Sequence, residues 1–214
     1  VKNLNMFIQN LKITNSICKA LSQVKLSYFL NISSDAIYED TMNFLTESSI
    51  KSPFSFHGTM HLSREIAFDK ITQKQGTLCP TLVYGPGDPH NGYGPNQFCR
   101  LLKNSENIKI FGEGEEKRDH IYINDVAKIA YLMMKHKVVD RINAVSGTVI
   151  SFKEIAEKCI KINNSKQNII SIPRNGPMPH NGYRAFDTKK LISYFHDFEF
   201  TKLDQGIKEI FKKA

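Results

Sequence analysis

The feature that constrains the fold of this chain most is a short apolar segment that ends abruptly in polar residues. Residues 26–32 are mostly apolar, and the polar stretch 33–38 follows directly. A second apolar run, residues 77–83, leads in the same way into a turn. Such runs are typical of strands buried in a parallel sheet, and open α/β sheets bind their ligands at the carboxyl ends of their strands. We therefore expect a ligand site where these two segments end.

Apolar residues at helical spacing surround the two strands and predict an α/β protein. Helices are expected at residues 4–21 and 58–74, and the alternation of helix and strand implies parallel strands joined by right-handed crossovers. A turn-rich loop is expected at 85–95. The remaining expected elements are a helix at 96–103, strands at 108–111 and near Ile142, a helix capped by Asn124-Asp125 that runs to Met134, a helix capped by Ser151, a strand at 168–172 and two closing helices.

Composition narrows the range of partners and compartments. No apolar stretch is long enough to cross a bilayer, so no membrane partner is expected. The four cysteines are scattered without C-x-x-C spacing, which argues against a disulfide framework or a zinc site and favours a reducing cytoplasm. The net charge of +8 comes without basic runs or interleaved aromatics. It fits a solvated, lysine-rich surface better than nucleic-acid binding, and it also suits an anionic ligand such as a nucleotide diphosphate.

Three motifs resemble one known family in their order and spacing. They are Ser33-Ser34-Asp35-Ala36-Ile37-Tyr38 at the first strand end, Thr81-Leu82-Val83-Tyr84-Gly85-Pro86-Gly87-Asp88, and Arg118-Asp119 within the segment from Gly112 to Asp125. Together they are similar to the extended short-chain dehydrogenase/reductases, the NAD-dependent sugar epimerase/dehydratase family. The resemblance runs over nearly the whole chain.

This resemblance implies a partial Rossmann-like parallel sheet with a small α/β substrate lobe toward the carboxyl end. Residues 1–90, with returning segments around 121–150, would form the carboxyl-terminal part of the NAD-binding domain. Residues 91–214 would form mainly the substrate-binding lobe. The implied cofactor is NAD or NADP, and the implied substrate is a nucleotide-diphosphate sugar. A homodimer is one assembly expected of such a chain.

The resemblance also assigns catalytic roles to Ser34 and to two histidines. In the family, a Ser or Thr at this strand end bonds the sugar hydroxyl, a Tyr transfers its proton, and a Lys four residues later lowers the pKa of that Tyr. The segment from His57 to Glu65 matches the helix, with His57 in the Tyr position and His61 in the Lys position. An imidazole with a pKa of about 6.5 is able to accept a proton at neutral pH, where a phenol is not. We expect Ser34 and the start of this helix to converge on one cleft.

Further contacts are implied for the cofactor and the substrate. The implied cofactor contacts are Ser33, His61 and Pro80. The implied substrate contacts are Asp35, Tyr84, Asn96, Arg118 and Arg184. The two arginines are expected on the diphosphate, because a guanidinium binds phosphate in a bidentate manner. Two of these residues have plainer alternatives, since Arg184 also fits a surface salt bridge and Asn96 also fits a helix cap.

The sequence departs from the family pattern in ways that bear on function. A dinucleotide-binding sheet begins with a strand, a glycine-rich turn and a helix that holds the pyrophosphate, and no segment here has that pattern. The chain begins with Val1, about halfway through the family's cofactor domain, so a fragment is expected. Asp35 is followed by Ala36 where 4,6-dehydratases carry a Glu, which favours epimerisation or alcohol/ketone redox. The histidine pair would also suit a metal, but no third ligand is identifiable and none is predicted.

Two functions remain open on the sequence alone. The first is an NAD(P)-dependent nucleotide-sugar epimerase or reductase that acts by hydride transfer at a sugar carbon. The second is a catalytically impaired relative that binds a nucleotide sugar or acts as an assembly partner. They differ in whether His57 replaces the catalytic Tyr or marks its loss.

Overall fold

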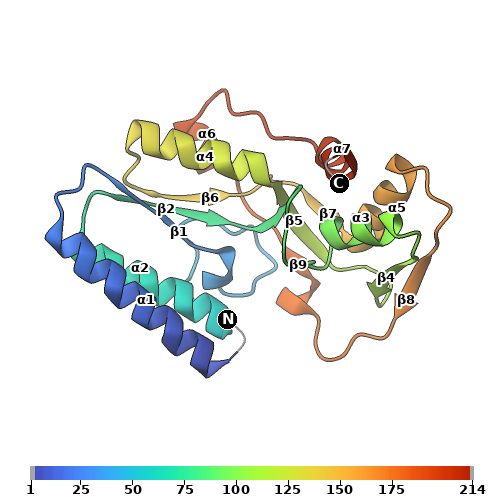
Figure 1. Cartoon of the computed structure of the whole chain (residues 1–214), viewed down its shortest axis with the longest axis horizontal. Coiled ribbons are helices and arrows are strands. Elements are labelled where there is room, and N and C mark those ends of the chain that lie inside the picture. The colour runs from blue at the N-terminus through green and yellow to red at the C-terminus, as the bar shows by residue number, and fades with distance from the viewer. Residues whose placement is uncertain (1–2, 213–214) are drawn as a thin grey trace.

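The computed structural model describes residues 3–212, in which three small β-sheets lie side by side with helices packed on them (Figure 1). The first sheet has the order β1-β2-β6 and consists of Phe29–Ile32, Gln75–Pro80 and Arg141–Ala144. All three strands are parallel, and Leu78 in the central strand lies opposite Ile32 on one side and Ile142 on the other. The predicted parallel sheet is confirmed. Among the described residues, no strand pairs with the outer edge of β1.

The prediction of a single strand at 77–83 is wrong, because the chain changes sheets at Thr81. β2 ends at Pro80, which has no N–H with which to continue the ladder. Thr81 donates its N–H to the last carbonyl of β6 at 3.2 Å and its hydroxyl to a carbonyl of β5 at 3.3 Å. From there β3 (Leu82–Tyr84) runs parallel to β5 (Lys117–Tyr122) in the second sheet. Thr81 therefore joins the two sheets.

The second and third sheets build the carboxyl-terminal lobe. β5 also pairs antiparallel with β7 (Val149–Ser151) and parallel with β9 (Tyr183–Arg184). The third sheet consists of the parallel strands β4 (Ile108–Phe111) and β8 (Ile169–Ile172). α3 (Pro95–Lys103), α5 (Phe152–Ile162) and α7 (Leu203–Lys212) pack together over this lobe (Figure 1). The division between an NAD-binding part and a substrate lobe near residue 90 stays a prediction.

Two pairs of helices cover the two faces of the first sheet (Figure 1). α1 (Leu4–Gln23) and α2 (Phe56–Ile71) pack against each other on one face, and α4 (Ile123–His136) and α6 (Lys189–Tyr194) lie on the other. The helices predicted at 4–21 and 58–74 are thus confirmed with shifted ends. Ser55 is the N-cap of α2 and accepts the N–H of Gly58, so the helix begins at Phe56, two residues before the predicted start.

The predicted cap of α4 is wrong. The helix begins at Ile123 with Tyr122 at its N-cap and no side-chain cap. Asp125 lies in the first turn and accepts the N–H and the hydroxyl of Thr201, each at 2.8 Å. This contact joins residues 76 positions apart, so no local pattern encodes it.

The apolar core is divided between the two parts of the molecule. One cluster lies among α3, α5 and α7, around Phe98, Phe152 and Ile207. Another lies between the first sheet and the helices α4 and α6, around Leu78 and Ile129. α1 adds little to either, since Thr14 is the buried residue on this helix. Within residues 3–212, no helix is long and apolar enough to cross a membrane.

Candidate active site

The end of β1 and the start of α2 meet at one place. Ser34 caps the short 3-10 turn η1 (Asp35–Ile37) by accepting the Ala36 N–H at 3.2 Å. α2 lies directly against this turn, because a Cβ at Gly58 would collide with the carbonyl of Ala36. Only glycine permits this approach, and it brings His57, in the first turn of α2, to the turn that carries Ser34. The structure thus packs the first turn of α2 against the turn that carries Ser34, and a shared catalytic role of Ser34 and His57 stays a prediction.

Both histidines of this helix are neutral at physiological pH. The rings of His57 and His61 pack edge to face with their centroids 4.6 Å apart. Burial lowers the pKa of His61 to about 3, and the charge of Arg64 adds to this shift. Burial also lowers the pKa of His57 below the usual 6.5. His57 is therefore able to accept a proton, but His61 brings no positive charge to the position where the family has a Lys.

Arg64 carries a positive charge beside His61 one turn later, and the sequence reasoning missed it. One Nη atom donates to the Ile32 carbonyl at the end of β1 and lies 2.9 Å from Nδ1 of His61. Because this N–H donates to Nδ1, the proton of the His61 ring belongs on Nε2. The Nε of Arg64 is buried and has no partner among the described residues. The i, i+3 spacing of the two residues on a helix was the available signal.

The predicted cofactor residues Ser33 and Pro80 lie at the ends of neighbouring strands. Ser33 follows β1, and Pro80 ends β2. The Ser33 hydroxyl is buried and finds no partner within the described part of the chain. A buried polar group without a partner indicates a missing ligand or water. No three His, Cys, Asp or Glu side chains gather as a metal site in residues 3–212.

Arg184, which the sequence predicts on a phosphate, is buried with its N–H groups engaged by the protein. It lies on β9 with 1% of its surface exposed. Its Nε donates to Asp35 Oδ2 at 3.0 Å, and its Nη1 donates to Asp40 Oδ1 at 3.1 Å. Its other N–H groups donate to the backbone carbonyls of Asp35, Tyr38 and Glu39. We call Arg184, Asp35 and Asp40 the Arg184 clasp, which ties the turn that carries Ser34 to β9.

A second group of charges lies on the same lobe and has free donors. Arg118 on β5 and Arg174 in the loop after β8 share Glu116, with N–O distances of 3.2 Å and 3.3 Å. The Nε of Arg118 and one Nη of Arg174 are buried and lack a partner among the described residues. Two guanidiniums around one carboxylate leave positive charge and unused donors, which suit an anion. We call these three residues the Glu116 arginine pair. Arg174 was missed, since its local sequence does not show that it reaches Glu116.

His180 lies between the two arginine groups. Its Nδ1 is 2.5 Å from Asp40 Oδ1 and 3.1 Å from Arg184 Nη1. Burial lowers the pKa of His180, and the charges of Arg118 and Arg184 lower it further. Its backbone is left-handed with φ of 52°, a conformation uncommon outside glycine. The clasp and the arginine pair are therefore neighbours around one imidazole.

Asn96 and Tyr84 lie at the loop that follows β3. Asn96 accepts the Gly85 N–H at 3.1 Å, and Gly94 is the N-cap of α3, so the helix-cap alternative for Asn96 is wrong. Tyr84 is 3% exposed and packs on α7, where a side chain at Gly206 would collide with its hydroxyl. No hydrogen bond links these two residues to Ser34, His57 or either arginine group within the described range. Their contact with a substrate stays a prediction.

Comparisons with known proteins agree with this architecture. Residues 1–145 match the model of the NAD dependent epimerase/dehydratase family. The fold is similar to UDP-glucuronic acid 4-epimerase from Bacillus cereus in complex with UDP-glucuronic acid and NAD, with a TM-score of 0.85 and 20% identity. It is also similar to UDP-N-acetylglucosamine 4-epimerase from Methanobrevibacter ruminantium M1 in complex with UDP-N-acetylmuramic acid, with a TM-score of 0.84 and 21% identity. RMD from Pseudomonas aeruginosa, complexed with NADPH, aligns with a TM-score of 0.79 and 18% identity.

The alignments also show how much of each protein is shared. They cover 95% of this chain in all three cases, and 66%, 68% and 72% of the respective solved chains. The chain thus spans about two thirds of the length of these structures. The family model covers well over half of this chain. The chain therefore belongs to the NAD-dependent epimerase/dehydratase family.

Proposed function

We propose that this chain carries the substrate site and the proton-transfer residues of an NAD(P)-dependent nucleotide-sugar epimerase or reductase. The observation that carries the proposal is the continuity of one site, from Ser34 and His57 through the Arg184 clasp to the Glu116 arginine pair. Arg118 and Arg184 are register partners on the adjacent strands β5 and β9. The Glu116 arginine pair therefore lies next to the Arg184 clasp, which holds the turn that carries Ser34. A nucleotide-diphosphate sugar has a matching order of groups, since its sugar hydroxyls follow its diphosphate.

In this proposal the Glu116 arginine pair binds the diphosphate. The unused N–H groups of Arg118 and Arg174 bond to phosphate oxygens. Charge-assisted bonds of this kind are worth about 1.5–3 kcal/mol each. Glu116 lies between the two guanidiniums and reduces their mutual repulsion when no ligand is present. The solved relatives from Bacillus and Methanobrevibacter hold UDP-linked ligands, which supports a UDP-sugar as the substrate class.

At the sugar end, His57 accepts the proton of the hydroxyl that becomes a carbonyl and returns it in the reverse step. Ser34 bonds to the same hydroxyl and orients it. The carbon that bore the hydroxyl gives up a hydride, so the two electrons of its C–H bond leave with that hydrogen. Arg64 acts through His61, whose ring it orients, and its charge adds to the burial that lowers the pKa of both imidazoles.

The cofactor in this proposal is NAD or NADP, and the residues at the two strand ends would hold its nicotinamide. The unpartnered Ser33 hydroxyl, the Nε2–H of His61 and the adjacent Pro80 would hold it. When bound, it accepts the hydride from the sugar carbon and gives it back. The described residues contain no glycine-rich turn between a strand and a helix for the pyrophosphate. We therefore expect weak NAD binding to these 214 residues, and tight binding by calorimetry would contradict this view.

Epimerisation or reduction is favoured over 4,6-dehydration. The chain has Ala36 where a dehydratase carries its Glu, and α2 covers the Ala36 carbonyl at Gly58. The neighbouring carboxylate, Asp35, accepts the Nε–H of Arg184 and is held in the clasp. Neither position offers a free carboxylate for a second proton transfer, so the site supports chemistry at one hydroxyl.

We further propose a homodimer that forms through α1 and α2 in a reducing cytoplasm. These helices lie together on one outer face (Figure 1), and they expose the apolar side chains Leu4, Ile8, Leu11, Phe56 and Ile66 by 37% to 55%. Exposed apolar surfaces of this kind are typical of interfaces. The scattered spacing of the four cysteines, without C-x-x-C, supports the reducing compartment. Light scattering should show a dimer that Leu11→Lys converts to a monomer, and a wild-type monomer would refute the interface.

Turnover of a panel of nucleotide sugars with NAD and NADP tests the proposed activity. The protein should be expressed from its complete reading frame. We expect turnover of at least one UDP-sugar and its loss in His57→Ala. Binding of nucleotide sugars without turnover would support the catalytically impaired relative instead. A protein that binds none of them would contradict both functions.

A further inference from the structure

Two phenylalanines flank the cap of α2, and their rings contact different parts of the molecule. Phe54 and Phe56 stand on either side of Ser55, the N-cap residue. The ring of Phe56 packs on Phe7 of α1 with the centroids 5.8 Å apart, so it belongs to the outer face of these two helices. The ring of Phe54 contacts His180, in the turn before β9, edge to face at 5.6 Å. Phe54 therefore reaches from the start of α2 to the carboxyl-terminal lobe.

Most of Phe54 is uncovered. Among the large apolar residues that the structure describes, Phe54 has the highest exposed fraction, 68%. A large apolar residue just before an N-cap commonly packs on the fourth residue of its helix. In α2 this fourth residue is Thr59, whose side chain offers a single methyl group. The chain therefore keeps a large aromatic ring exposed beside the proposed site, where burial against the helix would be the usual arrangement.

The Arg184 clasp holds the imidazole that Phe54 contacts. Nδ1 of His180 lies 2.5 Å from Asp40 Oδ1, and the same oxygen accepts an N–H of Arg184 at 3.1 Å. The imidazole is thus fixed by the clasp, and its contact with Phe54 restricts the phenyl ring in turn. A surface that is ordered before its ligand arrives loses less conformational entropy on binding. Phe54 is therefore a preorganised aromatic surface.

Phe54 also lies between the two ends of the proposed site. It precedes His57, at the proton-transfer end, by three residues. Its partner His180 lies beside the Glu116 arginine pair, close enough that the charge of Arg118 lowers the pKa of His180. A sugar ring that joins a diphosphate at the arginine pair to a hydroxyl at His57 passes through the space beside Phe54.

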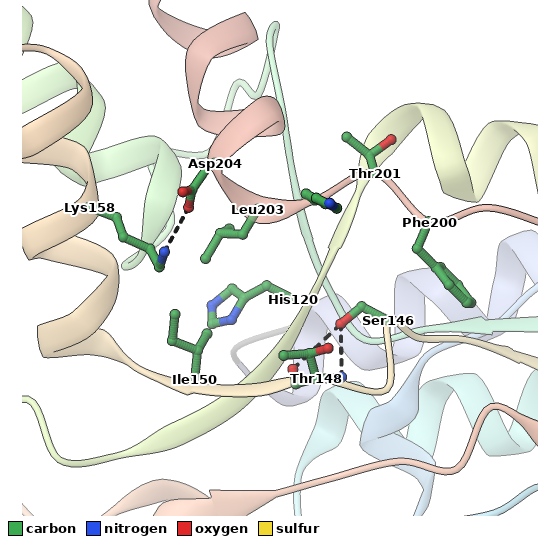
Figure 2. Close-up of a pocket in the computed structure, with 10 residues that line it drawn as sticks. His120, Ser146, Thr148, Ile150, Lys158, Phe200, Thr201, Leu203 and Asp204 are labelled. Atoms are coloured by element: carbon green, nitrogen blue, oxygen red, sulfur yellow. Dashed lines mark hydrogen bonds and ion pairs between the residues drawn. The ribbon is translucent and has the colours of Figure 1, made fainter.

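A cavity elsewhere in the molecule does not compete for the sugar. Figure 2 shows a cavity of about 410 Å³ in the carboxyl-terminal lobe, whose lining includes His120, Ile150 and Leu203. None of its lining residues belongs to the proton-transfer end, the Arg184 clasp or the Glu116 arginine pair. A sugar that links the two ends of the site therefore lies outside this cavity.

We propose that Phe54 is a specificity-determining residue, whose ring packs on the C–H face of the sugar, and that His180 positions this ring. A pyranose sugar presents a face of C–H bonds between its hydroxyl groups, and the face of an aromatic ring is flat and has negative electrostatic potential. The inference rests on the proposed function, because the diphosphate and the reacting hydroxyl define where the sugar lies.

Fluorescence tests the contact directly, because the sequence contains no tryptophan. The variant Phe54→Trp places a single indole at this position. Its emission should change with UDP-glucose or UDP-galactose and stay unchanged with UDP, which lacks the sugar. The matched control is Tyr131→Trp, at a 61% exposed position of α4 on the other face of the first sheet, and its emission should respond to none of them. An indole of Phe54→Trp that responds equally to UDP, or to no UDP-sugar that binds, would overturn the proposal.

Calorimetric titration of the 214-residue chain separates this inference from the proposed function. Phe54→Ala should weaken the binding of UDP-glucose or UDP-galactose by about 3- to 10-fold, the contribution of one aromatic contact, and leave UDP binding unchanged. If neither UDP nor a UDP-sugar binds to the unaltered chain, the proposed function and this inference both fail. If they bind, but Phe54→Ala weakens UDP and UDP-sugars alike or changes neither, this inference alone fails.

A second variant tests the positioning role of His180. His180→Asn removes the ring and keeps a residue that tolerates the left-handed backbone at this position. It should weaken UDP-sugar binding but not UDP binding. Combined with Phe54→Ala, it should cost no more than Phe54→Ala alone, because His180 acts through Phe54. Additive losses in the double variant would show that His180 does not position the ring.

Discussion

The two arginine groups that meet around His180 differ in what their donors do. In the Arg184 clasp, the N–H groups of Arg184 bond to carboxylates and carbonyls of the protein. In the Glu116 arginine pair, each arginine keeps a buried N–H without a partner among the described residues. A buried arginine whose donors are all engaged holds the frame, whereas one with unused donors is able to bind a ligand. The two groups therefore have separate roles in one site.

The largest expected effect is the loss of turnover in His57→Ala, which tests whether proton transfer depends on His57 and not on either arginine group. His57→Ala should lower turnover by about 10²- to 10⁴-fold, the contribution of a general base, and leave UDP affinity unchanged. The pKa of His57 is lowered by burial, so the base form persists below pH 6.5 and the acid limb of kcat/KM should lie under that value. Equal turnover in the variant, or an acid limb above pH 6.5, would rule out His57 as the proton acceptor.

The next effect concerns stability, and it tests whether the Arg184 clasp stabilises the fold. Arg184→Met should lower the free energy of unfolding by about 3–5 kcal/mol, because it leaves Asp35 without its buried partner. The control is Lys158→Met, whose ion pair with Asp204 is 39% exposed on the lysine side and 2.8 Å long. Such exposed pairs contribute about 1 kcal/mol or less. Urea unfolding measures both, and equal losses would show that the clasp does not hold the frame.

These contrasts also show what the sequence was able to predict. The parallel sheet and most of its helices were predictable, because strand-end polarity and helical spacing are local patterns. The Ser34 turn and the His57 helix were likewise found from local motifs. The switch of sheets at Thr81 and the bond from Asp125 to Thr201 were not, since both depend on residues distant in the chain. The same limit hid Arg174, whose partner Glu116 lies 58 positions away.

A further prediction concerns Arg64, an arginine that contacts a catalytic-site histidine and neither arginine group. Its charge lowers the pKa of both His57 and His61, so Arg64→Met should raise the pKa of His57 and move the acid limb to higher pH. Loss of the charged hydrogen bond to His61 should also lower turnover by about 10- to 100-fold. Arg64→Lys keeps the charge and should restore the original limb. A pH profile that is the same in all three proteins would show that Arg64 does not act on the histidines.

The central claim is that the Glu116 arginine pair binds the nucleotide diphosphate, and calorimetric titration of UDP into the 214-residue chain tests it most directly. We predict saturable binding that weakens by about tenfold in Arg118→Met and in Arg174→Met, the loss expected of one charge-assisted bond. Both variants should lose less free energy of unfolding than Arg184→Met, because Glu116 retains one arginine partner whereas Asp35 loses the arginine with which it pairs. UDP that binds equally well to the original chain and to both variants, or that does not bind at all, would contradict the account.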